Sequence, residues 1–270
     1  MSRIKRGKAQ RCLSCVKGWS PLSVDRYQVQ LWRRLFSMRK LLCSALLLAS
    51  AGCATVSTTD TATVCVANVQ SFANPEAGTR GDFRPNVLFS DVRIGPAAVG
   101  YGATGSRGDE ITISDGVLHL ARPGAAGGYR HRVDAAEGEG AYMLQLINVE
   151  VWRTPSALPA ISNLDALGAA ISNQVGAAGC IGAAKFAYRI EGRVRRAEWS
   201  LDTLPQRGDF VTEGHDVVVV GLFANVEQAK HFVPEGRNIH AHAVFPALGV
   251  AGHLKSLELE PGARLQLQAR

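Results

Sequence analysis

The sequence predicts an α+β fold rich in β-structure, built as two small lobes of mixed or antiparallel sheet with few helices. Three observations support this class. Apolar and polar residues alternate through much of residues 81–270, as they do in half-buried strands. Only one long segment has helical spacing instead. A stretch of about 190 residues suits one domain, or two small lobes that share a core.

The first 52 residues form a leader that holds much of the positive charge. They contain eleven Lys or Arg and a single acid, Asp25, whereas the rest of the chain contains nineteen bases and twenty-two acids. The net charge of +7 therefore does not describe the folded part. For this reason the sequence predicts no nucleic-acid partner.

The end of the leader resembles a bacterial lipoprotein signal. Arg39-Lys40 precedes the apolar run 41–49, and Ser50-Ala51-Gly52 then leads to Cys53. The resemblance implies cleavage before Cys53 and a lipid on that residue, which makes the chain an exported, membrane-anchored lipoprotein facing the periplasm. An uncleaved membrane-embedded segment is the alternative, although the run is shorter than the roughly 20 residues of a transmembrane helix.

The leader and the tether after it set the domain boundaries. Met38 stands where the signal would start, so residues 1–37 are interpreted as an upstream extension from a mis-assigned start codon. Residues 53–80 are rich in Thr, Ala, Ser and Gly, which predicts a flexible tether. The folded domain is then expected over residues 81–270.

The first lobe is predicted from a hairpin. Strands at residues 110–113 and 117–120 flank Asp115-Gly116, a dipeptide typical of a tight hairpin turn. Residues 142–152 also alternate, and they predict a further strand of this lobe.

One helix is predicted between the lobes. Ser162 or Asn163 can cap it, and glycines at 176 and 179 can end it. Its apolar stripe consists of Leu164, Leu167, Ile171 and Val175. Cys180 follows this helix and could pair with Cys65 of the tether in an oxidising periplasm, and the sequence leaves this pairing open.

The second lobe is predicted from three segments that precede the histidines. Residues 186–201 indicate a long strand or a bent hairpin. The four valines at 217–220 favour a strand buried on both faces. Residues 227–232 suggest a short helix or turn.

Three histidines near the C-terminus are the candidate metal ligands. His240 and His242 lie in a predicted strand at 238–245, and His253 lies in its hairpin partner at 250–259. Residues i and i+2 of a strand share a face, so His240 and His242 lie on one side.

The length of the connecting loop decides where the third histidine points. A loop at 246–249 places residue 245 opposite 250, and therefore His242 opposite His253, with His240 diagonal to the pair. Three imidazoles on one face can hold a metal at about 2.0–2.1 Å per nitrogen. A slip of one residue would turn His253 away, and the alternative is a set of structural histidines.

These residues together resemble the α-acetolactate decarboxylase family. Residues 236–259 are similar to its metal-binding hairpin, residues 95–123 to its N-terminal lobe, and residues 186–192 to the strand that enters its second lobe. The similarity extends over about 81–260. It implies zinc held by His240, His242 and His253, with Glu110 near the metal.

The resemblance also implies an activity, the conversion of 2-acetolactate to acetoin with loss of carbon dioxide, as in acetoin biosynthesis. Zinc with three protein ligands keeps an open position for the oxygens of a small hydroxy-keto acid. A carboxyl group must then deliver a proton to carbon, and Glu110 is the candidate. The alternative for Glu110 is an exposed carboxylate at a strand edge. A homodimer is also considered.

The sequence departs from the family where substrate would be handled. Ser200 stands where the family places an arginine, and Arg195, Arg196 and Arg207 are near enough to substitute for it. The alternative for these arginines is that they are plain surface charges. The late acids Glu258 and Glu260 are predicted to lie off the His253 face. These departures keep a second hypothesis open, a non-catalytic lipoprotein that binds a metal or a small ligand on the same scaffold. Copper, nickel and iron also suit imidazole sites.

Overall fold

The computed structural model describes residues 65–269 except 181, 183, 226–232 and 235. The predicted leader, the lipid anchor at Cys53 and the predicted turn at 227–232 lie outside the described residues. Among the residues that are described, no helix is both long enough and apolar enough to cross a membrane.

The first sheet has seven strands, and all their pairings are antiparallel. Its order is β1 (Gln70–Phe72), β7 (Gly140–Ile147), β3 (Val99–Thr104), β4 (Glu110–Ser114), β5 (Val117–Pro123) and β6 (Tyr129–Arg132), and β2 (Val87–Leu88) also pairs with β7. The short helix α2 (Pro75–Thr79) and the 3-10 turns η1 (Phe89–Asp91), η2 (Gly105–Arg107) and η3 (Ala125–Gly127) connect these strands.

The β4–β5 hairpin forms where the sequence predicts it. Asp115 and Gly116 have φ values of 51° and 73°, the left-handed backbone that a two-residue hairpin turn requires. The strand predicted at 142–152 is shorter than expected, because β7 ends at Ile147.

The second sheet also has seven strands, with β9 (Lys185–Leu201) at its centre. The other strands are β8 (Ser156–Ala157), β10 (Gly208–Glu213), β11 (Asp216–Ala224), β12 (Ile239–Phe245), β13 (Val250–Leu259) and β14 (Arg264–Leu267). A 3-10 turn, η5 (Pro246–Leu248), connects β12 to β13. The sequence left residues 186–201 as a strand or a bent hairpin, and the structure forms one continuous strand.

β9 organises this sheet because it pairs with two strands along each edge. Along one edge, β10 and β11 pair with β9 from Leu201↔Gly208 to Lys185↔Ala224. Along the other edge, β13 and β14 pair with β9 from Ser200↔His253 to Tyr188↔Leu267. Since β12 joins β11 to β13, the strands β9, β11, β12 and β13 close into a ring. This ring holds the histidine hairpin in a fixed register.

The helix α3 (Leu164–Ala177) confirms the predicted cap and stripe. The side chain of Asn163 accepts a hydrogen bond from the Ala166 N–H at 2.8 Å. The apolar stripe is buried in the main core: Leu164, Leu167, Ile171 and Val175.

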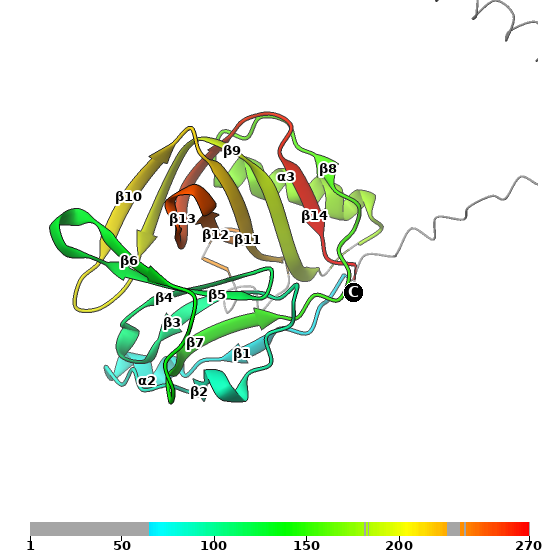
Figure 1. The fold of residues 1–270 in the computed structure, drawn as a ribbon. Coiled ribbons are helices and arrows are strands. Elements are labelled where there is room, and N and C mark those ends of the chain that lie inside the picture. Colours follow the sequence, from blue (N-terminus) through cyan, green and yellow to red (C-terminus); the bar gives the residue numbers. More distant parts are fainter. Residues whose placement is uncertain (1–64, 181, 183, 226–232, 235, 270) are drawn as a thin grey trace, which may run out of the picture. The chain divides into compact units, whose positions relative to one another are not determined.

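The main core lies between the two sheets. Val99 and Tyr101 of β3 pack in the same buried cluster as Trp199 and Phe245 of the second sheet. Figure 1 shows the green strands of the first sheet facing the yellow to red strands of the second. A smaller cluster that includes Ile111 and Leu144 belongs to the first sheet alone. The predicted fold of two β-rich lobes with few helices is confirmed.

The boundary between tether and domain needs correction, because folded structure begins before residue 81. β1 and α2 both lie within the predicted tether, and β1 pairs with β7. The disulfide between Cys65 and Cys180 also joins this segment to the end of α3. Paired backbone and a covalent link order residues 65–80, where composition alone indicated a flexible chain.

Candidate metal centre

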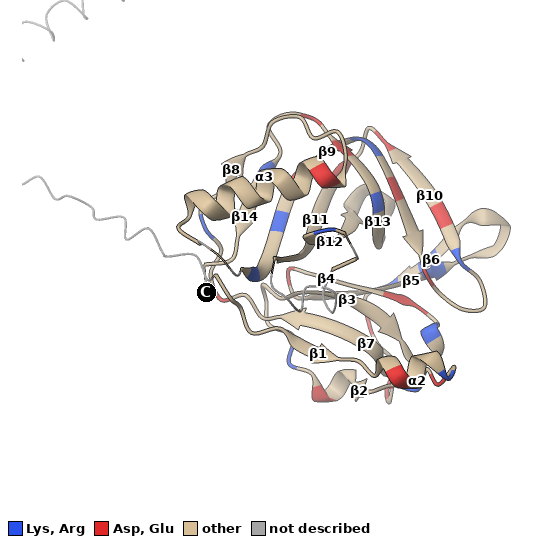
Figure 2. Cartoon of the chain, turned by 180° about the vertical axis from the view of Figure 1, so that it is seen from behind, with Lys and Arg blue, Asp and Glu red and all other residues tan. Residues whose placement is uncertain are grey.

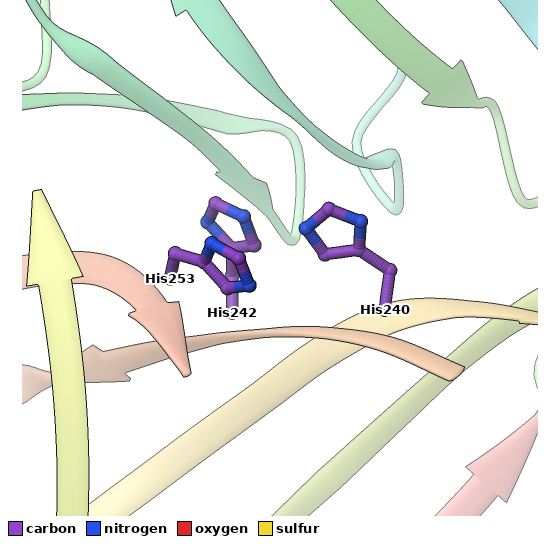
Figure 3. Close-up of side chains that lie close together, drawn as sticks. All are labelled: His240, His242 and His253. Atoms are coloured by element: carbon purple, nitrogen blue, oxygen red, sulfur yellow. The ribbon is translucent and has the colours of Figure 1, made fainter. Parts of the chain in front are cut away.

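The three candidate histidines converge as the hairpin register predicts. Phe245 pairs with Val250, and His242 therefore lies opposite His253. One ligand nitrogen from each of His240, His242 and His253 can be chosen so that all three lie within 4.8 Å of one another. Figure 3 shows the three rings on the same side of the ribbon, directed away from the β12 and β13 backbones. The arrangement could hold a metal ion.

Glycines in neighbouring strands let the backbones approach closely enough to build this face. A Cβ on Gly221 would lie 1.8 Å from the carbonyl oxygen of His240. The same gap admits the Tyr188 hydroxyl, which donates to that carbonyl at 2.9 Å. A Cβ on Gly252 would lie 2.7 Å from the ring of Trp199. Glycine is therefore required at both positions for β12 and β13 to hold their histidines here.

His242 is the most deeply buried of the three ligands, with 1% of its side chain exposed. Its Nδ1 lies 2.7 Å from the hydroxyl of Thr112 on β4, which leaves Nε2 for a metal. Burial lowers the pKa of His242 well below 6.5, and the nearby His253 and His240 add to this effect. The ring is therefore neutral at pH 7, as a metal ligand must be.

His253 has a carboxylate partner that the sequence did not indicate. Oδ2 of Asp202, the residue that follows β9, lies 3.4 Å from Nδ1 of His253. This contact holds the pKa of Asp202 below its ordinary value, and Arg207 adds to the effect from 2.7 Å. A carboxylate on Nδ1 fixes the ring orientation and directs Nε2 toward the site.

Glu110 is buried beside the histidines, and the alternative of an exposed carboxylate is wrong. Its Oε2 accepts the backbone N–H of Asp202 at 3.0 Å, and its Oε1 lies 3.8 Å from Nε2 of His242. Burial raises the pKa of Glu110 to about 8, and the nearby Asp202 charge adds to the rise. The carboxyl group therefore keeps a proton at neutral pH.

The first sheet also contributes an aromatic wall. The ring of Tyr101 stacks on His240 with centroids 3.8 Å apart, and it lies 5.5 Å from His242. Tyr101 is buried, and it limits the directions in which both imidazoles can turn. The site is thus built at the interface of the two sheets.

A cavity of about 490 Å³ opens onto the histidines. Its lining comes from both sheets and includes Tyr101, Arg107, Glu110, Tyr142, Met143 and Asp202 beside the three histidines. A larger hollow of about 810 Å³ lies between residues 122–130 and 206–210, and it includes none of the site groups. The smaller cavity is therefore the candidate binding site.

Arg195 and Arg196 do not reach this cavity, which corrects their assignment as catalytic candidates. Arg195 pairs with Glu258 at 2.6 Å and is 68% exposed, and Arg196 pairs with Glu198 at 2.5 Å. Ser200 faces the site because it lies opposite His253. Arg196 lies four residues from Ser200, about 13 Å along β9. The register between β9 and β13 shifts at Arg195, which lies still further from the site.

Charged side chains occur in both sheets, and β9 alone carries seven of them. Figure 2 shows Lys, Arg, Asp and Glu spread over both sheets and the connecting segments.

Fold and site together define a two-sheet β-protein with a three-histidine site between the sheets. No family model matches the chain, and no curated protein matches it. Among solved structures, the acetolactate decarboxylase of Bacillus subtilis subspecies spizizenii is 14% identical with a TM-score of 0.58, over 74% of this chain and 85% of that one.

Two further solved structures have a similar fold. The α-acetolactate decarboxylase of Bacillus subtilis strain 168 is 13% identical with a TM-score of 0.57, over 74% of this chain and 85% of that one. A Staphylococcus aureus protein of unknown function, described as similar to α-acetolactate decarboxylase, is 12% identical with a TM-score of 0.56, over 74% and 84%. At these identities the likeness shows a shared fold, and any activity must be argued from this chain's own residues.

Proposed function

We propose that this chain is a zinc-dependent decarboxylase that converts the 2-hydroxy-3-keto acid 2-acetolactate to acetoin and carbon dioxide. One observation supports this above all others. Three imidazoles with ligand nitrogens within 4.8 Å of one another share a cavity with a buried carboxyl group, Glu110. The donor set fits zinc, because three histidines supply three nitrogen ligands and leave a position for substrate.

Loss of carbon dioxide leaves an electron pair on the substrate that is delocalised over two oxygens as an enediolate. A zinc ion held by His240, His242 and His253 would supply Lewis-acid stabilisation of that negative charge. The chain's own residues prepare the rest of the site. Thr112 and Asp202 orient two of the imidazoles, and Tyr101 covers the third.

Glu110 is the proposed proton donor. Its Oε2 accepts the Asp202 N–H, so the proton is held on Oε1, the oxygen that faces His242. Decarboxylation of the substrate anion consumes one proton, and transfer from Oε1 to carbon gives neutral acetoin. Solvent then returns the proton to Glu110, which completes the cycle.

The exported location is also proposed, with the lipid on Cys53. The Cys65–Cys180 disulfide supports an oxidising compartment such as the periplasm, because structural disulfides are rare in a reducing cytosol. Labelling cells with radioactive palmitate would test the anchor. Lipid uptake by the wild-type chain and none by Cys53→Ser agrees with the proposal, and an unlabelled wild-type chain refutes it.

The activity is tested with the purified full chain, zinc and racemic acetolactate. Acetoin formation and bound metal are measured in the same samples, for the wild type, His242→Ala and His215→Ala. The first variant should lose stoichiometric zinc and all turnover. His215 lies outside the site, so its variant should keep both. Loss of zinc from His215→Ala would show that the ligand set is wrong.

A second function is favoured by one observation, the absence of Arg195 and Arg196 from the cavity. The chain would then be a non-catalytic lipoprotein that binds a metal or a small ligand. Stoichiometric zinc without acetoin formation would support this function over the first. A chain that binds no zinc would remove both.

A further inference from the structure

The cavity lining contains a cationic side chain, Arg107, that the sequence patterns did not indicate. It ends the η2 turn between β3 and β4, three residues before Glu110. Among the described residues that line the cavity, it is the one with a permanent positive charge. Arg107 thus stands in the cavity on the side of the first sheet, whereas Arg195 and Arg196 lie on the second sheet and outside it.

The guanidinium of Arg107 is held in place without being neutralised. Its NH2 group donates to the backbone carbonyl of Asp202 at 2.9 Å, and the guanidinium carbon lies 5.7 Å from the ring centroid of Phe83. Within the described part of the chain, no carboxylate oxygen comes within 4 Å of it. By contrast, Arg189, Arg193, Arg195, Arg196 and Arg207 all form ion pairs.

The backbone of this turn is held in a conformation that is unusual for its residues. Ser106 and Arg107 have φ values of 59° and 55°, a left-handed conformation that side chains other than glycine rarely adopt. Two backbone hydrogen bonds fix it, from Ser106 N–H to the Phe83 carbonyl and from Leu204 N–H to the Arg107 carbonyl. Such strain is concentrated at ligand sites, where the surrounding structure enforces it.

We infer that Arg107 binds the carboxylate of the substrate, and so selects anionic hydroxy-keto acids over their neutral counterparts. This inference rests on the proposed function. One guanidinium N–H is used on Asp202, and the remaining donors can bind a carboxylate in the bidentate manner that arginine favours. The apolar groups of Phe83, Tyr142 and Met143 also line the cavity, and they suit the substrate's methyl groups.

The assignment accounts for the serine at position 200. That residue is buried against His253 and carries no charge, so the second sheet supplies no cation at this end of the cavity. Arg107 supplies the charge from the opposite sheet. The carboxylate leaves as neutral carbon dioxide, so its contact with Arg107 weakens as the reaction proceeds. Removing Arg107 should therefore raise KM more than it lowers kcat.

The test compares a probe that has a carboxylate with a probe that has none. The first is 2,3-dihydroxy-2-methylbutanoate, which has a carboxylate and lacks the keto group needed for decarboxylation; the second is acetoin, which has no carboxylate. Binding to the zinc-loaded full chain is measured by titration calorimetry. Arg107→Met should weaken binding of the first probe roughly 10- to 100-fold and change acetoin binding less than about two-fold. Arg107→Lys keeps the charge and should lie between the wild type and Arg107→Met.

Arg193→Met is the matched control, because Arg193 lies on the surface of β9 in pairs with Asp216 and Glu260. It should leave the binding of both probes unchanged. Zinc content and thermal unfolding are measured for every variant, so that loss of the metal or of the fold is recognised. Should Arg107→Met misfold, the same comparison is made with Arg107→Lys.

The outcomes separate this inference from the proposed activity. A wild type that makes no acetoin, and yet prefers the carboxylate probe through Arg107, refutes the decarboxylase and supports the inference. A wild type that makes acetoin, with KM and probe binding unchanged in Arg107→Met, supports the decarboxylase and overturns the inference. An Arg107→Met variant that is folded and zinc-loaded but loses affinity equally for both probes also overturns the inference.

Discussion

The bond between Thr112 and His242 gives the sharpest test of how the two sheets build the site. Thr112 belongs to the first sheet and His242 to the second, and their side chains meet at 2.7 Å where both are buried. With Nε2 used for a metal, the neutral imidazole carries its hydrogen on Nδ1 and donates to the Thr112 hydroxyl. Thr112→Val keeps the shape of the side chain and removes this acceptor.

The loss of stability expected for Thr112→Val follows from the buried Nδ1 of His242, which is left without a hydrogen-bond partner. Leaving one buried donor without a partner costs about 1–3 kcal/mol of folding free energy. For a domain of this size that corresponds to a fall in Tm of roughly 2–10 °C. Zinc affinity should fall about 10- to 100-fold, because the imidazole loses the partner that orients it. Thr112→Ser retains the hydroxyl and should restore most of both quantities.

The assay is a zinc competition titration against a chromogenic chelator, paired with thermal unfolding of the metal-free chain. Thr212→Val is the matched control. Its hydroxyl is also buried and accepts a hydrogen bond from the Trp199 indole at 3.0 Å, away from the site. It should lower Tm and leave zinc affinity unchanged. Wild-type zinc affinity in Thr112→Val would refute the role given to this bond.

Three more predictions concern the acid, a histidine pair and the disulfide. Glu110→Gln should lower kcat about 10²- to 10⁴-fold at unchanged zinc content, and a smaller loss would exclude it as the proton donor. Burial lowers the pKa of His119 from 6.5 to about 4, and His131 adds to the shift. Between these pH values the unfolded chain binds a proton at His119 that the folded chain does not bind. The contribution of His119 to the free energy of unfolding is therefore fully present above pH 6.5 and declines toward pH 4. The decline is at most about 3 kcal/mol, and solvent screening reduces it to roughly half of that. Unfolding melts of His119→Gln should show a shallower decline than the wild type, and an equal slope would contradict the assignment. Replacing Cys65 and Cys180 with serine should cost about 2–5 kcal/mol, seen as a lower Tm that no longer responds to reductant.

The histidine hairpin could be predicted because its geometry is local. Strand alternation and a four-residue loop determine which residue lies opposite His242, and His253 occupies that position. Glu110 was found by resemblance, and the same alternation would have found Thr112, two residues further along β4 on the same face. The overlooked signal was a polar residue, Thr112, two positions after the candidate acid in the same strand.

The rest of the site could not be predicted because it depends on how the two sheets pack. Asp202 and Arg107 are joined by a hydrogen bond across 95 positions of sequence, and nothing in either local pattern specifies the other. From the sequence, Tyr101 cannot be distinguished from an ordinary core residue, and only the packed structure shows that it stacks on His240. Arg195 was chosen for its nearness in sequence to position 200, and nearness along a strand does not determine the face.

The length of β9 has a consequence for how the molecule opens. A strand of 17 residues that bonds to β10, β11, β13 and β14 cannot lose one neighbour without exposing the backbone groups of another. Partial fraying of this sheet is therefore costly, and its amides should exchange with solvent as a single cooperative group. An ion bound by imidazoles on β12 and β13 would slow that exchange over the whole ring, far beyond the residues that touch it.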